Sequence, residues 1–130
     1  MDKTTDALLR GYLSKADEKL ASAASLLKQR YYADAVSRAY YAVFHAAQAA
    51  LLTLGEQADT HRGLVTLFGL LLVKTGKVEK RYGRFLANLK DDREQSDYEV
   101  FAQIDRAMAQ RAIREARSFV RRIDRLIRTA

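Results

Sequence analysis

The chain has 130 residues, which fits one domain over residues 1–130 and leaves no room for a second hydrophobic core. It contains no cysteine, no proline and only six glycines, which excludes disulfides, thiolate metal sites and the frequent turns of an all-β fold. Its formal net charge of +7 favours either an anionic partner or a solvated basic surface, and the composition predicts an all-α protein.

The N-terminal segment mixes acidic and basic residues and lacks the apolar core of a signal peptide. The longest apolar stretch, residues 46–54, is interrupted by Gln48 and Thr53 and is too short to cross a bilayer. We therefore expect a cytoplasmic protein that has no membrane partner.

Apolar residues that recur every three or four positions predict a first helix over about residues 5–29. A second helix is expected to start with Asp34 as its cap and to end near Leu54, before Gly55. A third, shorter helix is predicted to begin at residue 59 or 60 and to end before Gly76.

A fourth helix is predicted over about residues 77–95, and a last one begins between residues 99 and 105 and runs almost to the C-terminus. Three long helices, with two shorter ones between them and short connections throughout, are typical of a helical bundle.

The last predicted helix has two opposite faces. At about 100° per residue, the apolar face contains Ile113, Ala116, Val120, Ile123 and Ile127. The basic face contains Arg114, Arg117, Arg121, Arg125 and Arg128. A face that only confers solubility usually alternates charges of opposite sign. The basic face therefore favours a polyanion or an acidic protein as partner.

The second predicted helix carries two residues suited to phosphate chemistry. Arg38 and His45 are separated by six residues, which places them on one helix face about 10 Å apart along the axis. Tyr41 lies on the same side. The other residues of this side are apolar: Ala42, Ala49 and Leu52. We therefore expect this helix to be buried on two sides, one covered by the bundle and the other by a second subunit or a cleft.

Histidine can transfer a proton near neutral pH, and arginine can hold a phosphate and stabilise the charge that develops on it. Arg38 and His45 therefore suit phosphodiester chemistry. Their spacing is equally compatible with a structural role, in which the arginine pairs with a carboxylate and the histidine with a backbone carbonyl. Too few carboxylates or histidines lie nearby for a metal, so we expect neither a metal nor another cofactor. His61 is expected to be a cap or surface residue.

The segment SRAYYAVFHAAQAALL, residues 37–52, resembles a signature of the HEPN superfamily of small helical domains. Residues 60–98 also resemble one prokaryotic branch of this superfamily, through Thr60–His61, a Leu-Phe pair, and an arginine followed by Asp97–Tyr98. The likeness covers roughly residues 8–128. It implies an up-and-down four-helix bundle with an additional short helix, commonly paired into a homodimer.

Many HEPN proteins are metal-independent endoribonucleases that use an arginine, a spacer of four to six residues and a histidine. By this resemblance, Arg38 and His45 form the catalytic pair, and the two copies of the motif face each other across the dimer. The implied reaction is attack of an RNA 2′-hydroxyl on the adjacent phosphate. The implied setting is a toxin–antitoxin pair with a minimal nucleotidyltransferase as partner.

Two positions depart from the family pattern. Active members often have a polar residue after the arginine, where this chain has Ala39, and some toxins have a tyrosine that the partner modifies with AMP, where this chain has Ala47. Tyr40, Tyr41 and Tyr98 are untested substitutes for that tyrosine. The alternative is therefore a non-catalytic HEPN module that binds a nucleotide or a nucleotidyltransferase. A DNA-binding regulator is a third and weaker alternative, since no helix-turn-helix spacing is present.

A second cluster near the end of the fourth predicted helix resembles the family. Arg93 and Asp97 are spaced i,i+4, so they either pair to order the helix end or line the cleft. The residues expected to bind RNA or a nucleotide are Tyr41, Arg93, Asp97, Tyr98, Arg114, Arg117, Arg121 and Arg125.

Overall fold

The computed structural model describes residues 1–129, which form helices joined by short connections, with no strand among them. The helices of this part of the chain are α1 (Lys3–Lys28), α2 (Tyr32–Leu52), α3 (His61–Phe68), α4 (Lys80–Tyr98) and α5 (Arg106–Arg128). A π-helical turn, η1 (Gly69–Val73), continues α3.

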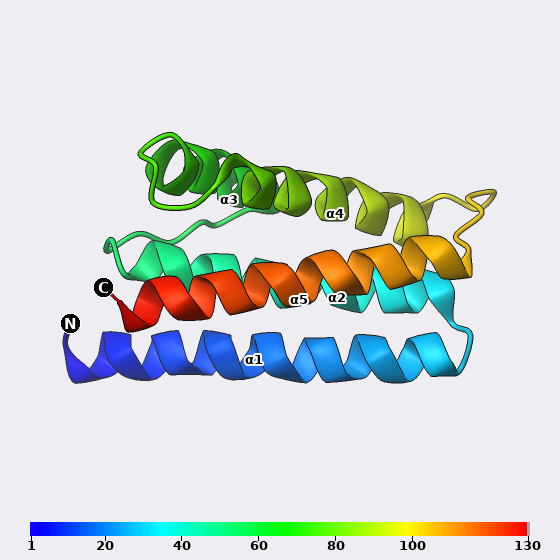
Figure 1. Ribbon diagram of the computed structural model, residues 1–130, viewed down its shortest axis with the longest axis horizontal. Helices are drawn as coiled ribbons and strands as arrows, with labels where there is room; N and C mark the ends of the chain where they lie inside the picture. Colours follow the sequence, from blue (N-terminus) through cyan, green and yellow to red (C-terminus); the bar gives the residue numbers. More distant parts are fainter. Residues whose placement is uncertain (130) are drawn as a thin grey trace.

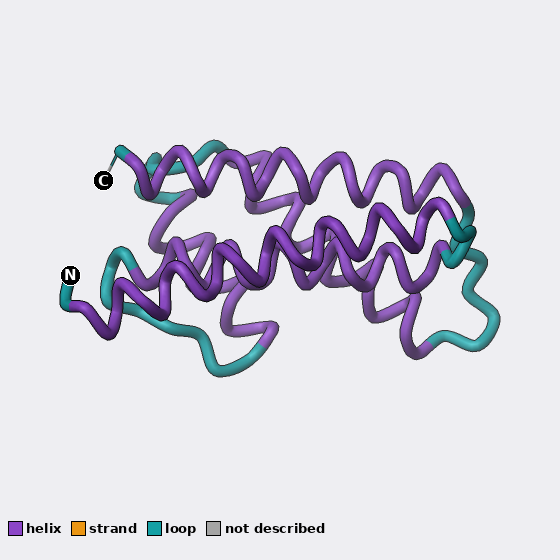
Figure 2. The backbone as a smooth tube through the Cα atoms, turned by 90° about the horizontal axis from the view of Figure 1, so that it is seen from below, coloured by secondary structure: helices purple, strands orange, loops and turns teal. Residues whose placement is uncertain are grey.

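The four long helices α1, α2, α4 and α5 run alternately in opposite directions along the molecule, so that the two termini lie at the same end (Figure 1). Figure 2 shows the same bundle turned by 90°, with the connections gathered mostly toward its two ends. This arrangement confirms the predicted up-and-down four-helix bundle with an additional short helix.

Local chemistry fixes several helix ends. The side chains of Asp2, Thr60 and Asp105 cap α1, α3 and α5, because each accepts a hydrogen bond from the backbone N–H three residues later, at 2.7, 2.8 and 2.9 Å. Gly55 and Gly76 follow α2 and η1 with φ angles of 75° and 79°, a region that glycine adopts without strain.

Three predicted helix ends were wrong: the start of α2 and both ends of α4, which begins at Lys80 rather than at residue 77. Tyr31, not Asp34, holds the N-cap position of α2, and its side chain makes no capping hydrogen bond. Asp34 lies instead in the first turn, where a carboxylate interacts favourably with the helix dipole. Helix α4 continues to Tyr98 rather than ending near residue 95, which places Asp97 and Tyr98 on a helix instead of in a loop.

Helix α2 is the centre of the bundle, since α1, α3, α4 and α5 all pack against it. Most of its buried side chains are alanines, which are completely inaccessible: Ala35, Ala39, Ala42, Ala46, Ala47, Ala49 and Ala50. Side chains this small let the neighbouring helices approach closely. The apolar side near His45 is covered by α1 of the same chain, because Ala49 and Leu52 pack against Leu9. Its burial therefore does not require a second subunit.

Helix α5 packs on α2 through the predicted apolar face, of which Ile113, Ala116, Val120 and Ile123 are buried. Its basic face consequently points away from α2. None of the helices formed by residues 1–129 combines the length and the apolar character that a membrane span requires.

Candidate functional site

Helix α2 leaves one strip uncovered. Every residue from 46 to 52 is buried. Between residues 35 and 45, five side chains remain exposed or half-buried, and we call them the α2 strip: Ser37, Arg38, Tyr41, Phe44 and His45. Their spacing of three and four residues puts them on one side of the helix. The two predicted catalytic residues thus share the one part of this segment that the protomer leaves accessible.

The imidazole of His45 lies against α1. Its ring stacks on Tyr12 with centroids 6.1 Å apart, and it meets the edge of Phe44 at 5.3 Å. Burial lowers the pKa of His45, and the charges of Lys19 and Lys15 lower this pKa further. His45 is therefore mainly neutral at neutral pH. Its Nδ1 is buried without a hydrogen-bond partner, so no hydrogen bond within the protomer selects one tautomer.

Arg38 is exposed, and its guanidinium forms neither an ion pair nor a hydrogen bond with any residue that the structure describes. The structural pairing that the spacing also allowed, arginine with a carboxylate and histidine with a carbonyl, is therefore not formed within residues 1–129. The guanidinium of Arg38 is therefore available to another molecule, and the half-buried imidazole of His45 is not engaged by a hydrogen bond within the protomer.

Arg93 reaches the α2 strip from α4. The residue is 6% exposed, and its guanidinium carbon lies 5.4 Å from the ring centroid of Tyr40, 5.7 Å from that of Tyr41 and 5.6 Å from that of Tyr98. Its Nη1 is 3.5 Å from an Asp97 oxygen and donates to the Tyr98 hydroxyl at 3.4 Å. The predicted Arg93–Asp97 pair is thus present. Burial on its own lowers the pKa of Arg93, but Tyr41, Tyr98 and Asp97 raise this pKa, so the guanidinium stays charged.

Asp97 connects this cluster to α2, because it accepts a hydrogen bond from the Ser37 hydroxyl at 3.4 Å. The Tyr40 hydroxyl lies 2.6 Å from Nδ1 of His61. Burial raises the pKa of Tyr40, so this phenol stays protonated and donates to the imidazole. Thr60 is the cap of α3, and the expectation that His61 caps the helix or lies free on the surface was wrong. Its ring packs against Phe44 at 4.9 Å.

Several residues of the site were not identified from the sequence. Tyr12, Lys15 and Lys19 of α1 flank His45, and His61 and Phe44 complete the aromatic cluster. The sequence does indicate that the three α1 residues share one side of the helix, because they recur at intervals of three and four beside the apolar stripe. Within residues 1–129, no three His, Asp or Glu side chains converge in a way that could hold a metal ion.

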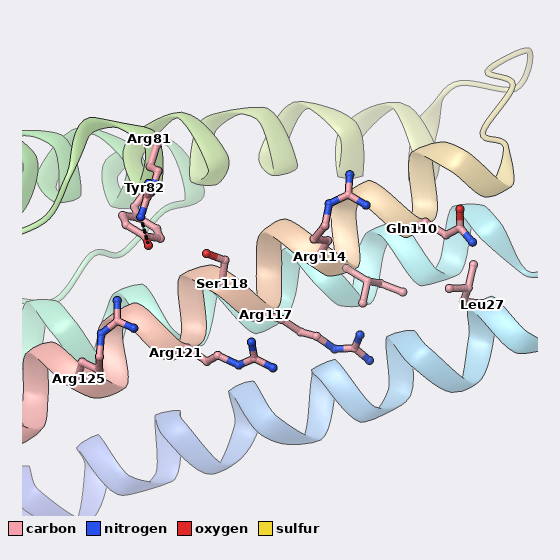
Figure 3. Close-up of a pocket in the computed structure, with 10 residues that line it drawn as sticks. Leu27, Arg81, Tyr82, Gln110, Arg114, Arg117, Ser118, Arg121 and Arg125 are labelled. Carbon is pink, nitrogen blue, oxygen red and sulfur yellow. Dashed lines mark hydrogen bonds between the residues drawn. The ribbon is translucent and has the colours of Figure 1, made fainter.

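The predicted binding residues do not form one site. Tyr41, Arg93, Asp97 and Tyr98 gather beside the α2 strip. The four arginines of α5 lie elsewhere, in a groove bounded by α1 and α4 (Figure 3), and they are Arg114, Arg117, Arg121 and Arg125. The structure therefore separates the arginine face from the Arg38–His45 pair.

We predict that Tyr40→Phe lowers the free energy of unfolding by about 1 kcal/mol, because it removes the buried hydroxyl that bonds His61. Tyr41→Phe is the matched control, since no hydrogen bond of its hydroxyl is present in the described chain. Urea unfolding at neutral pH measures both variants. Equal losses in the two would show that the Tyr40–His61 bond contributes nothing of its own.

The two histidines predict the pH dependence of stability. Burial lowers the pKa of both His45 and His61 in the folded protein, whereas in the unfolded chain each titrates near ~6.5. As the pH falls through about 6.5, the unfolded chain takes up protons that the folded chain does not, so the free energy of unfolding must fall. Urea unfolding from about pH 7.5 down to about pH 5.5 should show this loss, and His45→Gln/His61→Gln should reduce it. An unchanged slope in the double variant would contradict the prediction.

Comparison with known proteins gives a consistent result. The model of the HEPN domain family matches residues 9–126. The chain is 36% identical over 120 residues to "Putative toxin MJ0605" of Methanocaldococcus jannaschii, covering 92% of this chain and 89% of that protein. It is 33% identical to a UPF0332 protein of Thermotoga maritima, covering 94% and 92%.

Among solved structures, the crystal structure of TT1696 from Thermus thermophilus shares the fold. The TM-score is 0.79 at 20% identity, covering 91% of this chain and 97% of that one. The family match spans all five α-helices of residues 3–128 almost completely, and the bundle is the one that the resemblance implied. The chain belongs to the HEPN domain family.

Proposed function

We propose that this protein is a toxin-like, metal-independent endoribonuclease that cleaves RNA through Arg38 and His45. One observation carries the proposal: both side chains lie on the α2 strip, and neither uses its polar groups within the protomer. Lys15 and Lys19 add positive charge beside His45, which favours a phosphate there. The name of the M. jannaschii relative supports a toxin-like role. A nuclease of cellular RNA would act in the cytoplasm.

In the proposed reaction, neutral His45 accepts the proton of a ribose 2′-hydroxyl while the 2′ oxygen attacks the adjacent phosphorus. A new P–O2′ bond forms, the P–O5′ bond breaks, and the departing 5′ oxygen takes a proton from water. Arg38 holds the non-bridging phosphate oxygens and stabilises the negative charge that builds up on them. The lowered pKa of His45 keeps the imidazole in the form that can accept a proton at neutral pH.

We further propose that the protein acts as a homodimer in which the two α2 strips face each other. Tyr41 and Phe44 support this, because they leave aromatic surface half-exposed beside the catalytic pair. A second copy would cover this surface. A nucleotidyltransferase-type protein is the proposed partner, as in the toxin–antitoxin pairs that the family resemblance implies.

A non-catalytic role is the second candidate. The charged guanidinium of Arg93 among three tyrosine rings offers a nucleotide both a cation and aromatic surface. Ala39 and Ala47, the two departures from the family pattern, are weak evidence for this non-catalytic role. Ala39 and Ala47 are completely buried among the helices, so packing requires small apolar residues at these positions whether or not the protein is an enzyme.

The decisive measurement is cleavage of a labelled single-stranded RNA in the presence of a chelator. We expect the wild-type protein to cleave it, and Arg38→Ala and His45→Ala to lower the rate at least about a hundredfold. Arg10→Ala, which removes an exposed arginine from α1, is the matched control and should leave the rate unchanged.

Two results would reject the nuclease. One is RNA that stays intact with the wild-type protein. The other is cleavage that persists in His45→Ala. Nucleotide binding that survives in His45→Ala but is lost in Arg93→Gln would then favour the non-catalytic module.

The dimer can be tested by chemical cross-linking, because the chain contains no cysteine. We expect Arg38→Cys to form a species of doubled mass with a short bis-maleimide, since the two copies of position 38 would face each other. Lys74→Cys, exposed at the end of η1, is the control and should form no cross-linked species of doubled mass. Equal cross-linking of both variants, or a wild-type protein that sediments as a monomer, would reject this arrangement.

A further inference from the structure

A groove runs along the exposed face of α5 (Figure 3). It has a volume of about 840 Å³, and α1 and α4 contribute to its walls. Five arginines line it, four from α5 and one from α4: Arg81, Arg114, Arg117, Arg121 and Arg125. We call this feature the arginine groove.

The α5 arginines of the groove differ from their neighbours on the same helix. Arg111, Arg122 and Arg128 pair with carboxylates at 3.7, 2.9 and 2.9 Å. In contrast, none of the four groove arginines of α5 has a carboxylate oxygen within 4 Å among residues 1–129. Asp124, which lies on the α1 side of Arg121, is paired with Arg128. Asp17 of α1 also lines the hollow beside Arg117 and Arg121 but forms no ion pair with either. The groove therefore carries an excess of positive charge.

The α4 wall of the groove is polar. The Tyr82 hydroxyl accepts a hydrogen bond from Arg81 at 3.1 Å, and the guanidinium carbon of Arg81 lies 5.0 Å from the ring centroid. Burial on its own raises the pKa of Tyr82, but the hydrogen bond and the charge of Arg81, with the nearby Ser118 side chain, lower this pKa. Gln110 adds a further neutral hydrogen-bonding group.

The spacing of the arginines suits a repeating anion. From Arg114 to Arg125 the helix rises about 16 Å, comparable with the rise of about five stacked nucleotides. Guanidinium groups bind phosphate oxygens in a two-pronged geometry. The apolar lining is confined to Leu27, Ile113 and the ring of Tyr82, whereas the centre of a protein–protein interface is usually apolar and depleted of charge. These features favour a sugar–phosphate backbone over an acidic protein.

We infer that the arginine groove binds the phosphodiester backbone of RNA at a site separate from the Arg38–His45 pair. The two sites lie on different sides of the bundle, because α5 packs on α2 through its apolar face and the contacts of the α2 strip are with α1, α3 and α4. The choice of RNA rests on the proposed function, and the groove would give the substrate a second contact that does not depend on cleavage.

The test measures binding without cleavage. The His45→Ala variant is titrated with a fluorescein-labelled twelve-nucleotide oligouridylate, and anisotropy is followed at several salt concentrations. Adding Arg117→Gln/Arg121→Gln to this variant should weaken binding at least tenfold. It should also reduce the slope of log K against log salt by about 1.4, the share of two phosphate contacts on a single strand. The control is Lys3→Gln/Lys74→Gln, which removes two exposed charges outside the groove and should change the affinity less than twofold.

Three results would overturn the inference: an unchanged affinity in the groove variant, an equal loss in the control, or a glutamate-rich peptide that binds the groove more tightly than the oligouridylate. Cleavage in the wild type with unchanged binding in the groove variant would reject the groove but keep the nuclease. RNA binding that depends on the groove arginines, without any cleavage by the wild-type protein, would support the groove and reject the nuclease.

Discussion

The close packing of four helices around α2 is the constraint on which the rest of the structure depends. The completely buried alanines of α2 let α1, α4 and α5 approach its backbone, and this leaves only the α2 strip uncovered between residues 35 and 52. A larger side chain at position 39 or 47 would force neighbouring helices apart. The same helix therefore carries both the tightly packed core and the candidate site. Arg38, Tyr41 and His45 lie on its uncovered side, next to the buried alanines.

Periodicity along the chain predicted the helices and the faces of α5 because each depends on residues close in sequence. Which helix covers which face depends on packing between segments far apart in sequence, and periodicity carries no such information. For this reason the sequence predicts that a second subunit or a cleft covers the apolar side of α2, whereas Leu9 of α1 covers its C-terminal half. The start of α2 at Tyr32 instead of Asp34 has a more local cause, since no side chain caps this helix.

Only the part of the candidate site that lies on one helix could be predicted from the sequence. Arg38 and His45 share one helix, so their spacing placed them together. The surroundings of His45 come from Tyr12, Lys15 and Lys19 of α1, and those of Tyr40 from His61 and Arg93. These contacts depend on the register between helices. The electrostatic character of the site, a neutral imidazole among cations, thus arises from tertiary packing rather than from the motif itself.

The distribution of charge also bears on how two copies can pair. Dimerisation through α5 would bring two rows of unneutralised arginines together, and like charges in contact oppose association. The α2 strip carries one exposed arginine, with Lys15 and Lys19 of α1 nearby, beside half-buried aromatic rings. It therefore brings fewer arginines together than α5 does and offers apolar surface to bury. Because α5 faces away from this strip, a dimer built on it leaves both arginine grooves open to solvent. RNA bound in an arginine groove would then not compete with dimerisation. Each dimer would present two arginine grooves, one on either side of the shared cleft.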